Sequence, residues 1–169
     1  MNKIAIYDSN FVVGLVDEDD KWHRTALELH SLIKTKNLLI VYFGCVANEV
    51  LSVIAKRFEE KRKSPEFTTK LNKFKEIFPK EDITWSYEKV EKYYEKILAI
   101  MKKSSGRLNF HDALICVVAE EMGIKYIVSF DKDFDTIKEL TRIYDKQSLE
   151  SLVRDKPNKP DRPDRPDRP

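Results

Sequence analysis

The sequence KIAIYDSN, residues 3–10, indicates how the fold begins. Residues 3–7 are a short, mostly apolar run, which is typical of a buried β-strand. Asp8, Ser9 and Asn10 follow at once, and these residue types begin helices well because their side chains accept hydrogen bonds from free backbone N–H groups. The stretch therefore predicts a strand that leads directly into a helix, with Asp8 at the carboxyl end of the strand.

The same alternation of strands and helices continues along the chain. Short apolar runs predict further strands, and apolar residues at helical spacing predict the helices between them. Strands that alternate with helices predict an α/β protein whose parallel sheet is covered by helices on both faces. The expected strands are 3–7, 38–43, 82–85, 124–129 and 141–144, and the expected helices are 8–15, 22–34, 45–62, 67–78, 86–101 and 110–122.

The length and composition fit one domain followed by a tail. The chain has 169 residues, of which 41% are apolar and 36% are charged, and this is enough to bury a core. We expect the domain at residues 1–153. Residues 154–169 repeat Pro-Asp-Arg and contain no apolar side chain other than proline, so they predict an extended, disordered tail.

Several protein classes are disfavoured by the motifs that the sequence lacks. No apolar run approaches the ~18 residues of a transmembrane helix, and the N-terminus has no signal-peptide pattern. Cys45 and Cys116 form no CxxC motif and no disulfide framework. No P-loop, GxGxxG or GxSxG motif is present. We therefore expect a cytoplasmic protein that is not bound to a membrane.

Positive charge is concentrated in two segments, although the net charge is only +2. Residues 55–80 hold nine Lys or Arg and four Glu, and residues 85–107 hold six Lys or Arg and three Glu. A basic surface suits a polyanion such as RNA, although Lys-rich helices can also be simply solvated. The candidate RNA-binding residues are Lys61, Arg62, Lys63, Lys102, Lys103 and Arg107.

Four acidic residues from separate segments are expected at one edge of the sheet. Asp8 and Asp131 each follow a strand, and the carboxyl ends of parallel strands share the edge where ligands bind. Glu49 lies in the first turns of the helix after the second strand, at the same edge. Asp112 reaches this edge only if the segment 104–110 folds back over the sheet. Carboxylates that lie close together repel one another unless a cation is bound, and hard oxygen ligands select Mg²⁺ or Mn²⁺.

Each of these acids also has a structural alternative. Asp8 and Asp131 could merely cap the turns of helix that follow them. Asp112 could form a capping box with Asn109, and Glu49 could be an ordinary exposed glutamate. However, Glu49 and Asp112 interrupt apolar stretches, and a charge within an apolar helix face usually needs a partner. Their coincidence at one predicted edge favours a metal site.

Four short motifs, taken in order, resemble those of PIN domains, and most closely the VapC-type toxins of prokaryotic toxin–antitoxin pairs. The resemblance covers about residues 3–145 and implies a three-layer α/β/α sandwich with a central parallel sheet. It also implies a Mg²⁺- or Mn²⁺-dependent ribonuclease. The motifs are IYDSN (6–10), NEV (48–50), FHDALI (110–115) and SFDKDF (129–134), and the implied catalytic and metal-binding residues are Asp8, Glu49, Asp112 and Asp131.

The resemblance further implies supporting residues and partners. Asn10 and Ser129 match polar positions that orient ligands or metal-bound waters, and Asp133 matches a further acid beside the site. Toxins of this type act with an antitoxin protein, and the helices at 45–80 match a pair often used for dimerisation. The apolar residues of these helices also outnumber what one face of a small sheet can cover, so we expect a homodimer.

The favoured hypothesis is an endoribonuclease that hydrolyses RNA phosphodiester bonds with a divalent metal ion, as the toxin of a toxin–antitoxin pair. A housekeeping RNA-processing PIN nuclease and a non-catalytic PIN-like module that binds RNA or protein remain alternatives. A haloacid-dehalogenase-like phosphatase is disfavoured, because Asn10 stands where its DxD motif needs a second aspartate. Five tryptophan and tyrosine side chains could stack on RNA bases. Tyr94, however, fits the apolar stripe of its helix and is expected in the core. The five are Trp22, Trp85, Tyr87, Tyr93 and Tyr94.

Overall fold

The described part of the chain contains a five-stranded parallel sheet. The computed structural model describes residues 3–61 and 64–154. The strands lie in the order β3-β2-β1-β4-β5, and every neighbouring pair is parallel. The predicted α/β fold with a central parallel sheet is therefore confirmed. The strands are β1 (Ile4–Tyr7), β2 (Leu39–Phe43), β3 (Ile83–Thr84), β4 (Tyr126–Val128) and β5 (Thr141–Ile143).

The strand order reverses between β1 and β4. The chain moves from β1 outward through β2 to β3, and then returns to add β4 and β5 on the other side of β1. In such sheets a crevice opens at the carboxyl ends of the two strands that flank the reversal. Tyr7 at the end of β1 pairs with Val128 at the end of β4. The residues that directly follow, Asp8 and Ser129, are thereby brought side by side.

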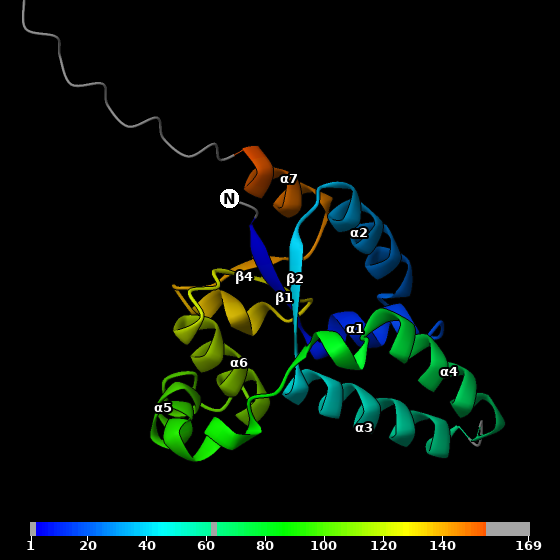
Figure 1. Ribbon diagram of the computed structural model, residues 1–169, viewed down its shortest axis with the longest axis horizontal. Coiled ribbons are helices and arrows are strands. Elements are labelled where there is room, and N and C mark those ends of the chain that lie inside the picture. The colour runs from blue at the N-terminus through cyan, green and yellow to red at the C-terminus, as the bar shows by residue number, and fades with distance from the viewer. Residues whose placement is uncertain (1–2, 62–63, 155–169) are drawn as a thin grey trace, which may run out of the picture.

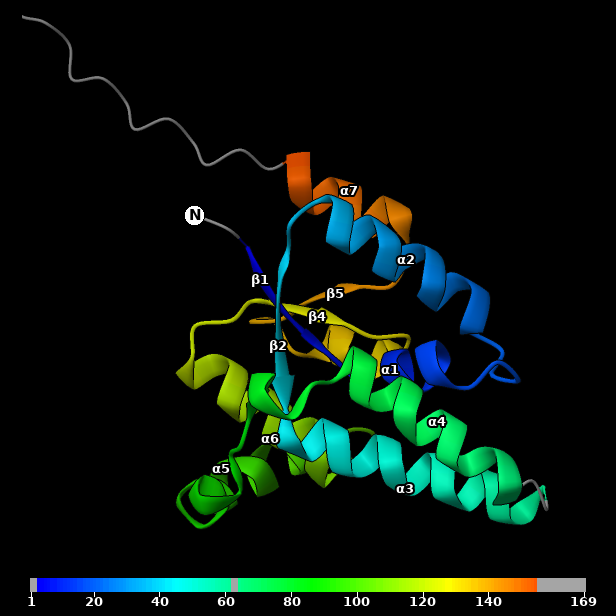
Figure 2. The same cartoon turned by 45° about the vertical axis from the view of Figure 1, so that its right-hand side comes forward.

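Helices cover both faces of the sheet (Figures 1 and 2). α2 (His23–Thr35) and α7 (Lys146–Arg154) lie together on one side, and α5 (Val90–Lys103) and α6 (Phe110–Glu121) lie on the other. α6 is buried without interruption from Asp112 to Ala119, because it is packed against both the sheet and its neighbouring helices. The three α/β/α layers agree with the predicted architecture.

Two helices begin at the carboxyl edge of the sheet. α1 (Ser9–Val16) directly follows β1, and α3 (Gly44–Glu60) directly follows β2. α1 is almost wholly apolar and packs against α2, α3 and α4 (Ser64–Ile77). α4 returns alongside α3, and the pair extends away from the sheet (Figure 1). The first turns of α1 and α3 therefore form part of the wall of the crevice.

The apolar residues of α3 and α4 are covered in part within a single chain. The two helices pack against each other and against α1, which leaves five of the large apolar side chains at most 5% exposed. Leu51, Phe67 and Leu71 are only half-buried, so the homodimer stays a prediction. The covered residues are Val50, Ile54, Phe58, Phe74 and Phe78.

Three other details differ from the sequence prediction or extend it. Tyr94 is 49% exposed, whereas Tyr93 is buried. Tyr93 and Ile97 lie four residues apart on one face of α5, and this face is the buried one, so Tyr94 lies at its edge. The final helix α7 was not predicted. It carries the body of the domain to Arg154, and the rest of the predicted tail lies outside the described residues. Within the described chain, no helix is long and apolar enough to cross a membrane.

Candidate active site

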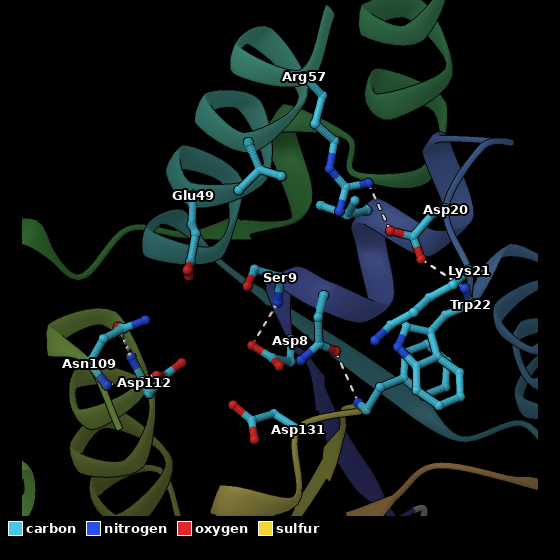
Figure 3. Close-up of a pocket in the computed structure, with 14 residues that line it drawn as sticks. Asp8, Ser9, Asp20, Lys21, Trp22, Glu49, Arg57, Asn109, Asp112 and Asp131 are labelled. Atoms are coloured by element: carbon cyan, nitrogen blue, oxygen red, sulfur yellow. Dashed lines mark hydrogen bonds and ion pairs between the residues drawn. The ribbon is translucent and has the colours of Figure 1, made fainter. Parts of the chain in front are cut away.

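A hollow of about 410 Å³ opens at the carboxyl ends of β1 and β4, where the strand order reverses (Figure 3). Five acidic side chains line it, and besides Asp20, which pairs with Arg57, they are the four acids that the sequence places at one edge. The four are Asp8 after β1, Glu49 on α3, Asp112 on α6 and Asp131 after β4. Figure 3 shows their carboxylates directed toward a common space.

Asp8 is held in a fixed orientation although it is almost completely buried. Its Oδ1 accepts a hydrogen bond from the backbone N–H of Ser9 at 2.7 Å, and its Oδ2 accepts one from the Ser129 hydroxyl at 2.6 Å. Burial raises the pKa of Asp8 to about 7, and the negative charges of Asp112 and Glu49 add to the increase. Asp8 thus caps α1, as its structural alternative proposes, and also faces the acidic hollow.

Ser129 connects the two strand ends through its hydroxyl group. Besides donating to Asp8, this oxygen accepts hydrogen bonds from the Asp131 backbone N–H at 2.9 Å and from Asn10 Nδ2 at 3.1 Å. Asn10 in turn accepts from the backbone N–H of Phe130 at 2.9 Å. The hydroxyl has one proton and two lone pairs, so its hydrogen-bonding capacity is fully used. Asn10 and Ser129 therefore hold the loop after β4 against the start of α1.

Asp112 reaches the hollow because the chain reverses between α5 and α6. Ser105 and Gly106 have positive φ angles of 55° and 77°, and the Leu108 N–H donates to the Ser104 hydroxyl at 3.2 Å. This turn brings the N-terminus of α6 over the sheet edge, which is the condition that the sequence sets for Asp112.

The Asp112 carboxylate has a structural contact and a face toward the hollow. Its Oδ2 accepts from the Asn109 N–H at 2.8 Å, and Asn109 Oδ1 accepts from the Asp112 N–H at 3.0 Å, which completes a capping box. Burial raises its pKa to about 6, against the Asn109 hydrogen bond, while the charges of Glu49, Asp131 and Asp133 add to the increase. The capping alternative is thus correct, but it does not remove the residue from the acidic cluster.

Glu49 has an oxygen atom with no partner. Its Oε2 is buried and makes no hydrogen bond in the structure. The side chain points from the first turns of α3 toward the other acids (Figure 3). A buried, unpaired carboxylate oxygen is costly, so this atom is the clearest sign that the hollow accommodates a positively charged ligand.

Asp131 and Asp133 occupy different places after β4. Asp131 lines the hollow, and its Oδ1 accepts from the Asp133 N–H at 2.8 Å, which caps the short 3₁₀ helix Lys132–Thr136. Asp133 is half-buried and does not line the hollow, although its charge contributes to the raised pKa of Asp112. Asp133 is therefore close enough to influence Asp112 without lining the hollow, and its supporting role stays a prediction.

The donor atoms in the hollow fit a hard divalent cation. The four side chains supply carboxylate oxygens, and no histidine or cysteine lines the hollow. Within the described residues, no group of three or more Asp, Glu, His or Cys is arranged to hold a metal ion by itself. Direct ligation of one ion by all four acids therefore does not match this arrangement. Mg²⁺ commonly keeps several waters and binds through one or two carboxylates and substrate phosphates, and the hollow fits that mode.

An ion-pair network that was not predicted from the sequence reaches the far wall of the hollow through Arg57 and Asp20. Arg57 on α3 donates to Asp17 at 2.9 Å and to Asp20 at 2.7 Å. Lys70 and Lys73 on α4 lie 3.3 and 3.4 Å from Glu18. The run of four acids at residues 17–20, opposite a segment of net positive charge, is the signal that could have revealed this network. Much of the basic character of 55–80 is therefore neutralised within the domain.

The six cations proposed to bind RNA lie away from the hollow or outside the described residues. Lys61 is exposed at the end of α3 and pairs with Asp19 at 3.1 Å. Lys102 and Arg107 are exposed near the turn after α5, and Lys103 lines a different hollow. Arg62 and Lys63 lie outside the described residues. RNA binding by this set stays a prediction.

The comparisons with known proteins agree with this geometry. The family model for the PIN domain matches residues 5–140. Two solved structures have the same fold: VapBC2 of Rickettsia felis bound to a DNA fragment from their promoter, and VapC20 of Mycobacterium tuberculosis, a Sarcin-Ricin loop cleaving toxin. The first has a TM-score of 0.60 and 19% identity over 83% of this chain and 97% of its own. The second has a TM-score of 0.61 and 18% identity over 79% and 95%. Among curated proteins, no sequence matches significantly.

Proposed function

Because this chain belongs to the PIN-domain family, we propose that it is a divalent-metal-dependent endoribonuclease and the toxin of a toxin–antitoxin pair. The observation that carries the proposal is the acidic hollow at the carboxyl ends of β1 and β4, in which Glu49 Oε2 is buried without a partner. Four of its acids come from four segments, so they meet only through the fold. Such a cluster of carboxylates suits a reaction in which a bound cation places positive charge beside a phosphate.

One or two of the carboxylates of Asp8, Glu49, Asp112 and Asp131 would bind Mg²⁺ or Mn²⁺ directly, and the others would contact it through waters. A bound divalent ion supplies an activated water at neutral pH and neutralises charge that develops on the phosphate. The raised pKa values of Asp8 and Asp112 indicate that the ionised cluster is strained in the absence of a cation. Cation binding and ionisation of these two groups are therefore expected to reinforce each other.

The surrounding residues of this chain keep the acids in position. Ser129 holds Asp8 through its hydroxyl, and it also holds the Asp131 backbone. Asn109 holds Asp112 through the capping box. Positioning of this kind typically changes metal affinity by about 10- to 100-fold when it is lost. Since no histidine lines the hollow, proton transfer in this mechanism would involve carboxylates and water.

The likeness in fold to VapC20 and to the VapBC2 complex supports the toxin assignment over a housekeeping RNA-processing role. By the same likeness, an antitoxin protein is the expected partner. The homodimer is proposed from the family resemblance. Expression of the chain with and without a neighbouring antitoxin gene separates the two roles, because only a toxin would arrest growth when it is expressed alone.

The direct test is cleavage of single-stranded RNA with Mg²⁺ or Mn²⁺ by the wild-type chain, Asp8→Asn and Glu49→Gln. Glu49→Gln is the sharper variant, because Glu49 Oε2 makes no hydrogen bond that the change would break. Glu59→Gln is the matched control, since Glu59 is an exposed glutamate on the same helix. We expect the first two changes to abolish cleavage and the control to retain it. Metal-dependent cleavage that survives Glu49→Gln would reject this site, and an inactive wild-type chain that still binds RNA would favour the non-catalytic module.

A further inference from the structure

An aromatic pair lies in the same hollow as the acids, on the wall opposite α6. Trp22 and Phe130 stack with their ring centroids 4.6 Å apart and their planes inclined by 12°. Both residues line the hollow together with Asp131 (Figure 3). Trp22 is 37% exposed, so part of its indole is accessible from the hollow.

Both members of the pair are fixed relative to the acidic cluster. The backbone N–H of Phe130 donates to Asn10 at 2.9 Å, and Phe130 stands between the site residues Ser129 and Asp131 in the chain. The backbone N–H of Trp22 donates to Asp20 at 2.8 Å. Asp20 is itself held by Arg57 through the ion pair described above. The indole is therefore a rigid surface and not a side chain at the tip of a free loop.

One face of the indole is available to a ligand. A nearly parallel ring covers the other face at 4.6 Å, so the Lys21 ammonium, 5.3 Å from the Trp22 ring centroid, lies over the open face. Lys21 is exposed, and four rotatable bonds carry its charge, so its ammonium can move aside when a ligand stacks on this face. Among the described cations that line the hollow, Arg57 is occupied by Asp17 and Asp20, whereas Lys21 is in no ion pair. The Trp22 ring and the Lys21 ammonium together fit a ligand that has a flat ring and a negatively charged group next to it.

We propose that the open face of Trp22, backed by Phe130, stacks an unpaired base of the RNA substrate while Lys21 contacts a phosphate next to that base. The inference rests on the proposed function, because it takes RNA as the substrate of the acidic hollow. A base stacked on Trp22 lies beside Asp131. The phosphodiester bonds next to that base therefore lie close to the acidic residues of the hollow. Stacking on an aromatic face tolerates every base, so Trp22 sets the position of the strand and not its sequence.

The test measures binding separately from cleavage. Short single-stranded RNA is titrated at low salt in EDTA, where no metal-dependent hydrolysis occurs, against the wild-type chain and Trp22→Leu. Leucine keeps an apolar cover on Phe130 but removes the flat π face. We expect binding to weaken by about 5- to 140-fold, the range for one stacked base. Trp22→Phe should restore much of the affinity. Trp85→Leu is the matched control, because Trp85 is 50% exposed and does not line the hollow.

An abasic scan distinguishes stacking from a merely structural role. One abasic nucleotide is moved along the RNA, and we expect a single position to weaken binding to the wild-type chain. The same position should have no further effect on Trp22→Leu, because the stacking partner is already missing. A second readout uses Trp85→Phe, in which Trp22 is the only tryptophan. RNA with a base at that position should quench its fluorescence, and the abasic RNA should not.

Three outcomes would overturn the inference. They are a wild-type chain that does not bind the RNA, a Trp22→Leu chain that binds it as tightly as wild type, and an abasic scan that is identical for both chains. The proposed hydrolysis is judged by the separate cleavage assay with Mg²⁺. Trp22-dependent binding without cleavage would leave the stacking site standing and reject the hydrolysis. Cleavage with binding that is independent of Trp22 would do the reverse.

Discussion

Replacing Asp112 with asparagine should stabilise the metal-free protein while it weakens the response to metal. Asparagine retains an oxygen that can accept the Asn109 N–H, so the capping box is kept. The change removes only the charge, and that charge lies beside Glu49, Asp131 and Asp133 in a buried position. Asp112→Asn therefore separates the electrostatic role of the residue from its role at the helix N-terminus.

The size of the effect follows from the pKa. The pKa of Asp112 is raised from 3.8 to about 6, chiefly by burial. Since one pKa unit corresponds to about 1.4 kcal/mol, the ionised carboxylate costs the folded state roughly 3 kcal/mol at pH 8. Asp112→Asn should recover most of this free energy. For a domain of this size, that corresponds to a rise in Tm of roughly 6–12 °C.

The gain should depend on pH in a defined direction. Because the pKa of Asp112 is higher in the folded than in the unfolded chain, the folded state binds more protons between about pH 4 and pH 6. The stability of the wild-type chain from this group therefore falls as the pH rises through that window, and the cost is complete above it. The advantage of Asp112→Asn should be near zero at pH 4 and largest at pH 8.

Urea unfolding followed by circular dichroism, in EDTA at pH 4.5, 6 and 8, measures these differences. Addition of Mg²⁺ should then stabilise the wild-type chain by linkage, by about 2.7 kcal/mol at a metal concentration 100 times Kd. Asp112→Asn should gain less, so that its advantage shrinks or reverses. The two titrations together show whether the charge is retained for metal binding at a cost in stability.

Asp145→Asn is the matched control for helix capping. Asp145 also accepts a backbone N–H near the start of a helix, from Ser148 at 2.7 Å, but it does not line the hollow. Its replacement should change stability by less than about 0.5 kcal/mol at every pH, because Asp and Asn cap equally well. A metal-free Asp112→Asn chain that is less stable than wild type at pH 8 would refute the reasoning and assign Asp112 to capping.

Three further predictions test other parts of the site. Ser129→Ala removes the hydroxyl that donates to Asp8. It should lower the free energy of unfolding in urea by about 1–3 kcal/mol and the Mn²⁺ affinity in calorimetry by about 10- to 100-fold. Ser129→Thr should preserve both, and an unchanged Mn²⁺ affinity in Ser129→Ala would contradict the positioning role of Ser129. Lys21→Gln should reduce the slope of the logarithm of RNA affinity against the logarithm of salt concentration by roughly 0.7. Lys61→Gln should change this slope less, because Lys61 pairs with Asp19. Equal effects would indicate that RNA binds along the basic segment 55–80. Light scattering at high micromolar concentration should give a mass near twice 19.9 kDa, and a monomer would reject the predicted homodimer.

The sequence by itself determined the order of the strands and helices and the polarity of the sheet. Alternating apolar runs can be read locally, because a strand or a helix depends mainly on residues within a few positions of one another. The same local patterns place Asp8 and the segment 129–131 directly after strands. Two segments of the site could therefore be assigned to one edge of the sheet from the sequence alone. Glu49 could be placed at the same edge from its position in the helix after the second strand, and Asp112 only on the condition that the segment 104–110 folds back. The resemblance to PIN domains is confirmed by the family model, which matches residues 5–140.

Surface features were predicted less well, because the partners of a charged or aromatic side chain are distant in the chain. The basic segment 55–80 suggests an RNA-binding face when it is considered alone. Four of its cations, however, pair with the acids at 17–20. The apolar residues of α3 and α4 similarly suggest an interface, but five of the eight are buried by the packing of these helices against each other and against α1. The run of acids at 17–20 is visible in the sequence, but nothing local identifies the cations that pair with it or shows which apolar side chains become buried.

Only the tertiary structure decided how the site is assembled. Asp112 enters the hollow because the turn at Ser105 and Gly106 reverses the chain, and Trp22 joins it because its loop packs against Phe130. The raised pKa values of Asp8 and Asp112 likewise arise from burial and from charges on other segments. Electrostatic and packing energies depend on distances through space, and the fold sets these distances between residues that are more than a hundred positions apart in the chain.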